Sequence, residues 1–246
     1  KWLREGEGRD LYLVGGAFRA LARMHIAQTN YPLAIVHHYV LRREEARDLS
    51  SVVLAASRRV LERMPGAPQK RLADLPFAAV VLRRLLRVTG AARVVFSANG
   101  LREGWYARLL DPAERALDPL LAAAREVAYR WGRDAGLPQA LLAWTDPLFP
   151  GEEPRHRGLR EAACWVSDSG SHDHPEYRAE QVFLRVLRQH GVGLDHHARA
   201  FLALTAALRY EAGPDAPCLA PTRALLDVPT IRRAEALGAA LRLAYT

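Results

Sequence analysis

Residues 11–23 read LYLVGGAFRALAR, a short apolar run that meets two glycines and continues as an amphipathic helical pattern. This order predicts a strand, a tight turn and a helix. Because Gly15 and Gly16 carry no Cβ atom, a ligand can approach the backbone closely at this turn. The first amides of a helix lack intrahelical partners, and the helix dipole favours negative charge there. The turn is therefore a candidate anion or nucleotide site, although glycines also occupy such turns for steric reasons alone.

Predicted strands and helices alternate over the first 110 residues. Strands are predicted at residues 10–15, 33–41 and 93–98, and helices at residues 17–28, 42–62, 73–88 and 101–110. This alternation is typical of an α/β layer. Three strands make a thin sheet, and the sequence begins without methionine. We therefore expect the chain to begin in mid-protein, with further strands upstream.

The strand signal disappears at Asp111. Helical patterns follow at residues 111–133, 137–144, 155–168, 175–190, 196–212 and 230–245, separated by Gly and Pro breaks. Consecutive helices without strands predict an all-α domain. We place the domain boundary near residue 110, which gives an α+β chain with domains at 1–110 and 111–246.

The charge balance indicates a negatively charged partner. The 246 residues contain 35 basic and 27 acidic residues, a net charge of +8, and the only lysines are Lys1 and Lys70. Arginine offers phosphate a planar fork of donors, so nucleic acid, a nucleotide or a phosphate polymer would suit this composition. A coding bias toward Arg and Ala is the alternative explanation.

The cysteine content and the hydropathy pattern favour a cytoplasmic protein. Two cysteines, Cys164 and Cys218, are too few for a disulfide framework, and there is no Cys-x-x-Cys zinc motif. Cys164 lies on an apolar helical face, where a core position is expected. No apolar run approaches the ~18 residues of a membrane span, and the first residues have no apolar signal-peptide core.

A second candidate site lies in residues 97–104, SANGLREG. This segment follows the predicted strand at 93–98, and open α/β sheets bind ligands beyond the carboxyl ends of their strands. Asn99 and Gly100 supply a turn, and Arg102 and Glu103 stand at a helix start. The alternative is a plain turn that carries a solvated charge pair.

Histidines suggest a metal site only weakly. His172, Asp173 and His174 lie near Asp168 in sequence, and His196 and His197 begin a later helix. Such residues bind metals when they converge, but neighbours on one loop rarely do so unaided. Loop and capping roles are the alternative. His37 and His38 are expected on opposite faces of a strand, with one of them buried.

Four segments together resemble the exopolyphosphatase and guanosine pentaphosphate phosphohydrolase (Ppx/GppA) family. They are VGGAFRALAR at 14–23, YPL at 31–33, VFSANGLREG at 95–104, and AACWVSDSG at 162–170 with HPEYRAEQ at 174–181. The resemblance implies a ribonuclease-H-like lobe of the actin-like ATPase superfamily, followed by an HD-like helical domain. It also implies hydrolysis of a terminal phosphate of polyphosphate or guanosine pentaphosphate with Mg²⁺, in the cytoplasm and as a homodimer.

The resemblance assigns binding roles by position. The residues implied to face phosphate or nucleotide are Gly15, Gly16, Arg19, Arg71, Gly100, Arg102 and Glu103. No catalytic residue is assigned, because the family's first lobe, with its phosphate loops and catalytic glutamate, is not in this sequence. The 246-residue chain alone is therefore expected to be inactive.

The helical domain departs from the family pattern at one point. Where relatives carry His-Asp-Ile-Gly, this chain has Ser167, Asp168, Ser169 and Gly170. Loss of that histidine removes a metal ligand, so we assign no metal-binding residue and interpret the helical domain as structural or polyanion-binding. The leading hypothesis is an exopolyphosphatase-like phosphohydrolase. A guanosine pentaphosphate phosphohydrolase and a non-catalytic module that binds polyphosphate or nucleic acid are the alternatives.

Overall fold

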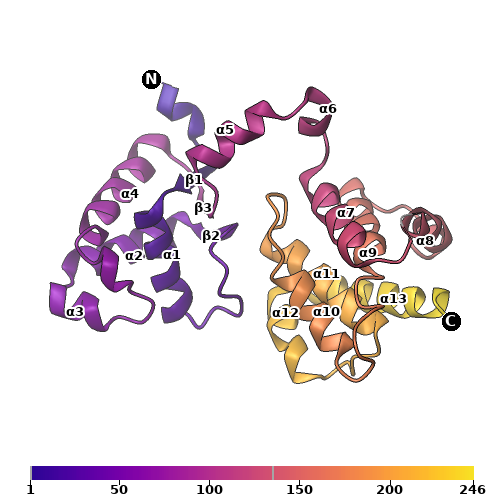
Figure 1. Ribbon diagram of the computed structural model, residues 1–246. Helices are drawn as coiled ribbons and strands as arrows, with labels where there is room; N and C mark the ends of the chain where they lie inside the picture. Colours follow the sequence, from indigo (N-terminus) through magenta and orange to yellow (C-terminus); the bar gives the residue numbers. More distant parts are fainter. Residues whose placement is uncertain (1, 135) are drawn as a thin grey trace. The chain divides into compact units, whose positions relative to one another are not determined.

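A computed structural model describes residues 2–134 and 136–246 and divides the chain into two compact units, residues 1–110 and 111–246 (Figure 1). The first unit combines a small sheet with helices, and the second contains helices and no strand among its described residues. The predicted mixture of strands and helices is therefore confirmed. None of the helices in the described ranges combines the length and the apolar character that a membrane crossing requires.

The first unit is built on a three-stranded mixed sheet. Its strands are β1 (Asp10–Val14), β2 (Tyr39–Arg42) and β3 (Arg93–Ser97), in the spatial order β1-β3-β2. Strands β1 and β3 are parallel, with Val14 paired to Ser97, and β2 is antiparallel to β3. Because parallel strands end at the same edge of a sheet, the turns after β1 and β3 leave the sheet at one edge.

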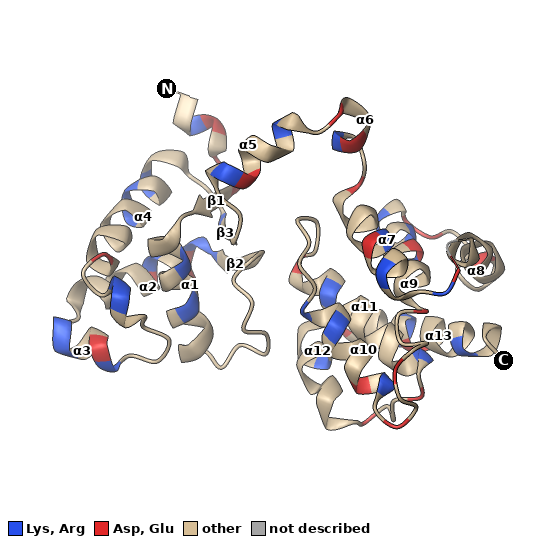
Figure 2. Ribbon diagram, viewed as in Figure 1, with Lys and Arg blue, Asp and Glu red and all other residues tan. Residues whose placement is uncertain are grey.

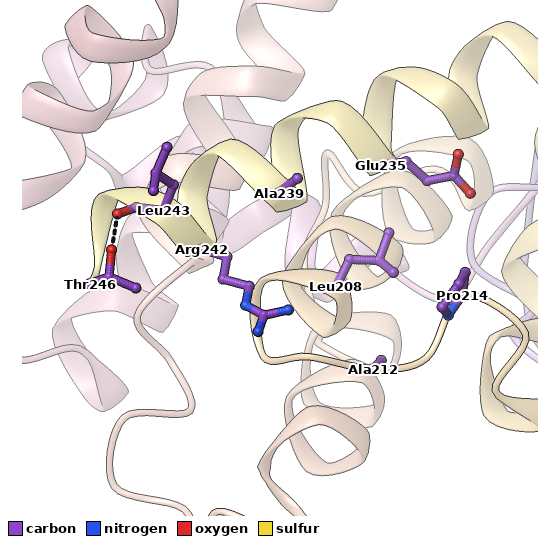
Figure 3. Close-up of a pocket in the computed structure, with 8 residues that line it drawn as sticks. All are labelled: Leu208, Ala212, Pro214, Glu235, Ala239, Arg242, Leu243 and Thr246. Atoms are coloured by element: carbon purple, nitrogen blue, oxygen red, sulfur yellow. Dashed lines mark hydrogen bonds between the residues drawn. The ribbon is translucent and has the colours of Figure 1, made fainter.

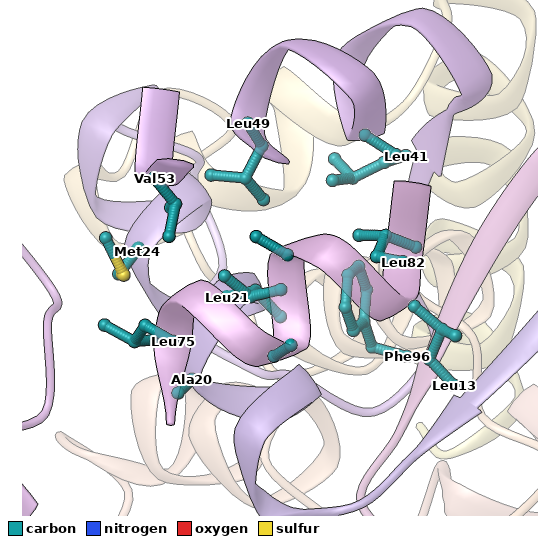
Figure 4. Close-up of a cluster of buried hydrophobic side chains, with 14 of the residues drawn as sticks. Leu13, Ala20, Leu21, Met24, Leu41, Leu49, Val53, Leu75, Leu82 and Phe96 are labelled. Carbon is teal, nitrogen blue, oxygen red and sulfur yellow. The ribbon is translucent and has the colours of Figure 1, made fainter. Parts of the chain in front are cut away.

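Helices cover one face of this sheet. They are α1 (Gly16–Gln28), α2 (Arg43–Ala55), α3 (Arg58–Arg63) and α4 (Leu75–Thr89), with short 3₁₀ turns η1 (Trp2–Gly6) and η2 (Gln69–Arg71). Helix α5 (Leu101–Leu109) follows β3 and contains no buried residue. Figure 4 shows Leu13 and Phe96 of the sheet gathered with Leu21 of α1 and Leu82 of α4. All four side chains are at most 2% exposed, so this cluster is the hydrophobic core of the unit.

The second unit packs around one central helix. Its elements are α6 (Pro112–Arg115), α7 (Pro119–Trp131), α8 (Leu137–Thr145), η3 (Asp146–Leu148), α9 (Pro154–Val166), α10 (Arg178–Leu187), α11 (His196–Arg209), η4 (Pro217–Leu219), α12 (Ala220–Leu225) and α13 (Val228–Ala244). Helix α11 contacts α9, α10, α12 and α13, and residues 198–207 are buried without exception. This stretch is apolar except for Arg199 and Thr205, and its burial on every side places α11 at the centre of the bundle.

The predicted strand at 33–41 is wrong over most of its length. Residues 33–38 form no strand, and β2 begins only at Tyr39. His38 adopts a φ of 58°, which interrupts an extended chain, and its amide donates to the carbonyl of Phe96 at 2.8 Å. His37 and His38 therefore do not alternate across a strand, and their rings lie 4.5 Å apart.

Two predicted long helices are each divided by local chemistry. The helix predicted at 42–62 stops at Ala55, and Ser57 begins α3 by accepting a hydrogen bond from the amide of Val60. The helix predicted at 111–133 is interrupted before Pro119, which has no N–H to continue the hydrogen-bond ladder. Asp118 caps the new start by accepting from the amide of Leu120.

Candidate functional site

The carboxyl ends of β1 and β3 bring the two predicted glycine turns together. Helix α1 begins at Gly16 directly after β1, and α5 begins after Gly100, three residues beyond β3. A Cβ atom at Gly100 would lie 3.8 Å from Cγ1 of Val14, so the turns are neighbours in space. Two helix N-termini thus begin at one edge of the sheet, the position at which open α/β sheets bind ligands.

Gly15 and the start of α1 form the first part of the site. Gly15 has a φ of 120°, a backbone conformation that side-chain-bearing residues rarely adopt. Its carbonyl accepts the first helical hydrogen bond, from the amide of Arg19 at 3.1 Å. No described side chain caps α1, so its first amides remain available to an anion.

Arg71 comes close to α1 because Gly16 has no side chain. A Cβ atom at Gly16 would lie 3.1 Å from Nη2 of Arg71. Arg71 also donates through Nη1 to Oδ2 of Asp74 at 3.0 Å. The helix dipole places partial positive charge at the N-terminus of α1, where the guanidinium of Arg71 adds a full positive charge. An anion bound between the helix start and Arg71 would interact favourably with both. The structure therefore joins Gly16 and Arg71, which are distant in sequence.

Arg19 connects the two turns. Its Nη1 atom donates to the carbonyl of Ala98 at 2.6 Å, which ties α1 to the segment after β3. The carboxylate of Glu103 accepts from the amide of Gly100 at 2.6 Å. Hydrogen bonds from its own amide and from that of Gly100, together with the charges of Arg102 and Arg19, lower the pKa of Glu103.

The two helix starts consequently differ. The ionised Glu103 caps α5 and supplies negative charge at its N-terminus, whereas α1 has no such cap among the described residues. Gly100 has an extended backbone that other residues can adopt. The Arg102 side chain is exposed and makes no hydrogen bond or ion pair with another described side chain. Of the two turns, the α1 turn with Arg19 and Arg71 is the stronger anion-binding candidate.

A second cluster lies around residues 167–170 in the helical unit. Asp168 accepts hydrogen bonds from the backbone amide of Arg133 at 2.9 Å and from its guanidinium at 2.8 Å. A guanidinium thus engages both carboxylate oxygens that a metal ion would need. In the described part of the chain, no group of three His, Cys, Asp or Glu side chains is placed to hold a metal ion. Arg133 was not singled out by sequence, because 35 residues separate it from Asp168.

The other residues considered for a metal site, and Cys164, are held by ion pairs, backbone hydrogen bonds or burial. Asp173 pairs with Arg185 at 2.8 Å, and Nδ1 of His174 accepts from the amide of Glu176. Burial lowers the pKa of His197, which stands in the first turn of α11. The predicted core position of Cys164 is confirmed, since it is 1% exposed and burial raises its pKa to about 12.

Arginines also line a hollow between α2 and α4. Arg43 and Arg47 are four residues apart on α2, and Arg83 and Arg87 are four residues apart on α4. Residues at this spacing share a helix face, so four guanidinium groups border one space of about 180 Å³. Basic residues along both helices are visible in Figure 2. The repeated spacing in the sequence was the signal that could have revealed this cluster.

A hollow of about 560 Å³ lies beside α13 and contains none of the predicted site residues. Figure 3 shows Leu208, Ala239 and Leu243 along it, with Glu235 and Arg242 among the residues drawn. Glu235 is paired with Arg223, and Arg242 is paired with Glu211. Both charges are paired, the hydroxyl of Thr246 donates to the carbonyl of Leu243, and the other lining residues are apolar, so this hollow shows no arrangement for chemistry.

Comparison with known proteins relates the chain to a protein family and to a yeast protein. The family described as "Exopolyphosphatase, C-terminal" matches residues 120–246, from α7 to the C-terminus. The chain is also similar to Retrograde regulation protein 2 of Saccharomyces cerevisiae, with 28% identity over 137 residues. That alignment covers 51% of this chain and 22% of the yeast protein, so the chain spans only a minor part of the relative's length.

Proposed function

The chain belongs to the Ppx/GppA exopolyphosphatase family, whose C-terminal domain its residues 120–246 match, and on this premise we propose a role in releasing terminal phosphate from inorganic polyphosphate. The observation that carries the proposal is the uncapped N-terminus of α1 with Arg19 and Arg71 beside it. Amides and guanidinium groups are donors that suit phosphate oxygens. The family match and the anion-binding geometry, found in different units, support the same chemistry.

The first unit would be the second ribonuclease-H-like lobe of the full protein. The parallel pair β1 and β3, with helix starts at one edge, supports that assignment. The helical unit would be the HD-like domain, with Arg133 on Asp168 instead of a metal. Two free cysteines among the described residues support a reducing cytoplasmic setting.

The chemical step would require groups beyond this chain. The resemblance implies a glutamate from the preceding lobe that activates water, and a Mg²⁺ ion. The described residues do not offer Mg²⁺ a donor set: Glu103 caps α5, and Asp74 is paired with Arg71. We therefore assign this chain a positioning role, in which the α1 amides, Arg19 and Arg71 hold the phosphate and stabilise its negative charge.

The arginine hollow between α2 and α4 favours a long polyanion over a single nucleotide. It lies beside Arg93 and Ala91, at the sheet edge opposite to the glycine turns, since Arg43 donates to the carbonyl of Ala91 at 2.9 Å. A long phosphate polymer can place negative charge at both edges of the sheet, whereas guanosine pentaphosphate carries its phosphates close together and can reach one edge. Guanosine pentaphosphate remains the alternative substrate, because it presents the same terminal phosphoanhydride.

The same hollow favours a second candidate function, polyanion binding without hydrolysis. Arg47, Arg83 and Arg87 make no ion pair with any described residue. Such uncompensated charge attracts polyanions at long range whether or not chemistry follows. Binding of this kind weakens steeply as salt concentration rises.

Phosphate release separates the two functions. The intact protein is expected to release orthophosphate from long-chain polyphosphate in the presence of Mg²⁺, and the 246-residue chain alone is expected to bind polyphosphate without release. Arg71→Gln should raise KM by about tenfold, the loss of one charge-assisted contact. Arg59→Gln, which removes an exposed charge elsewhere, is the matched control.

Other outcomes would redirect the assignment. Metal-dependent release by the 246-residue chain alone would contradict the placement of the catalytic glutamate outside it. Salt-sensitive binding without any release by the intact protein would select the binding module. Preferential cleavage of guanosine pentaphosphate in a competition assay would select the alternative substrate.

A further inference from the structure

A hollow of about 290 Å³ in the helical unit is bordered by four arginines, Arg133, Arg178, Arg209 and Arg242. They come from the segment just after α7, the start of α10, the end of α11 and the last turns of α13. Tyr210 and Tyr245 also line it. These elements are far apart in sequence, so only the packing of the bundle brings the four charges to one place.

Arg209 is buried without a counter-ion. Its residue is 8% exposed, and its guanidinium carbon lies 3.8 Å from the ring centre of Tyr210 and 3.9 Å from that of Tyr245. Its Nε atom has no hydrogen-bond partner, and no described carboxylate lies within ion-pair distance. Burial lowers the pKa of Arg209, which shows the cost of placing this charge away from water.

Among the other residues that line the hollow, some are paired with a carboxylate and some, like Arg209, have no counter-ion or hydrogen-bond partner in the described part of the chain. Arg133 is neutralised by Asp168, and Arg242 lies 3.3 Å from Glu211. Arg178 has no acidic partner among the described residues, and its buried Nε is without a hydrogen bond. The hydroxyl of Ser171 is also buried and unpartnered. The residues that carry these three buried, unsatisfied donors all line one space, and buried polar groups normally find partners.

The tyrosines hold Arg209 in a fixed position. The hydroxyl of Tyr245 lies 2.9 Å from Oγ of Ser167, and that of Tyr210 accepts a hydrogen bond from the amide of Gly170 at 2.9 Å. A Cβ atom at Gly170 would lie 2.2 Å from Cγ2 of Val182, so only glycine fits there. The segment that departs from the family's metal motif thus supports an arginine site.

We propose that this hollow binds phosphate groups of an inorganic phosphate, either orthophosphate or a short phosphate chain. Arg178 and Arg209, which both line the hollow, would grip phosphate oxygens through their planar forks. At about 290 Å³ the space lies below the range usual for drug-sized ligands, and Arg209 covers the tyrosine faces turned toward it. Both features disfavour a nucleoside.

Binding to the 246-residue chain tests the proposal without any activity measurement, so it can fail independently of the proposed hydrolysis. Calorimetric titrations with orthophosphate and with tripolyphosphate give the affinities. Arg209→Met and Arg178→Gln are each expected to weaken binding at this site at least about tenfold, the loss of one charge-assisted contact. The arginines between α2 and α4 stay intact in every variant and provide a constant background.

Arg232→Gln is the matched control, because it removes one exposed charge on α13 outside the hollow. It should leave the affinity within about twofold of the wild type. Thermal unfolding without phosphate gives a second readout. Arg209→Met should keep or raise Tm, because an unpaired buried charge is removed, and should lose the rise in Tm that phosphate causes in the wild type.

Three results would overturn the proposal. The first is that Arg209→Met and Arg178→Gln bind tripolyphosphate as tightly as the wild type does. The second is an equal loss of affinity in Arg232→Gln, which would show that the net charge of the chain, and not this hollow, causes the effect. The third is tighter binding of a guanosine nucleotide than of tripolyphosphate at this site. Tighter binding of tripolyphosphate than of orthophosphate would identify a chain, and equal binding a single phosphate, as the occupant.

Discussion

Gly15 and Gly16 are neighbours in the chain, yet the structure needs each for a different reason. Gly15 has the backbone conformation that only glycine adopts easily, while the space around its missing Cβ is open. Gly16 has ordinary helical geometry, and its missing Cβ makes room for the guanidinium of Arg71. Gly15 is needed for its backbone conformation, and Gly16 is needed because the side chain of Arg71 occupies the space of a Cβ atom.

Two alanine substitutions should therefore separate stability from binding. Gly15→Ala is expected to lower the free energy of unfolding by about 1–3 kcal/mol, because alanine is strained at this φ. Gly16→Ala should leave stability unchanged or raise it by up to about 1 kcal/mol, because alanine favours helices. Its Cβ should displace Arg71 and weaken polyphosphate binding.

Urea unfolding and polyphosphate titration of both variants provide the measurements. The wild type and Gly104→Ala serve as references, since a Cβ at Gly104 in α5 meets nothing within 4 Å. Unchanged polyphosphate affinity in Gly16→Ala would remove Arg71 from the candidate site.

At the scale of elements, capping and proline explain where the sequence pattern was insufficient. Strands β1 and β3 follow the predicted runs, because their apolar residues are bounded by clear turns. The pattern missed the break at Ser57 and the break at Pro119, where a local hydrogen bond begins a new helix. Hydrophobic periodicity continues across such breaks, so periodicity alone cannot find them.

Helix α9 contributes a buried charge that fastens neighbouring elements. Arg160 is 1% exposed and donates to Glu152 at 2.9 Å, to Asp146 at 2.6 Å and to Thr145 at 2.7 Å. The hydrogen bond from Arg160 is the main cause of the lowered pKa of Asp146. α8, η3 and α9 are thus joined through one guanidinium group.

Arg160→Met is expected to lower the free energy of unfolding of the helical unit by about 3–5 kcal/mol, because Glu152 loses one partner inside the protein. Arg157→Met provides the matched control: Arg157 contacts the same Asp146 at 2.9 Å but is half exposed. Its loss should cost at most about 1 kcal/mol. Chemical denaturation of both variants measures the difference, and equal losses would contradict the assignment of a buried network.

At the scale of the whole molecule, each unit has its own buried core. The first unit is organised around the cluster with Phe96, and the second around α11. Between them, residues 101–119 are exposed throughout, and α5 and α6 contain no buried residue. Few side chains therefore hold this segment in place, which is typical of regions with low local stability.

Limited trypsin digestion should cut first within residues 101–119, at Arg102, Arg108 or Arg115. Opening of this segment exposes no core, so both products should remain folded. Mass spectrometry identifies the cut, and circular dichroism with thermal unfolding of the separated products checks their structure. Early cleavage inside α4 or α11, or unfolding of either product, would argue against independent cores.

The sequence by itself determined the family, the order of most helices and strands, the buried position of Cys164 and the glycine turn at residue 15. These features follow from local spacing, which the chain carries in its residue order. Tertiary structure alone decided that Arg71 reaches Gly16, that Arg133 engages Asp168 and that two tyrosines enclose Arg209. Each of these pairs long side chains from separate elements, and their meeting depends on how helices pack, which residue periodicity does not report.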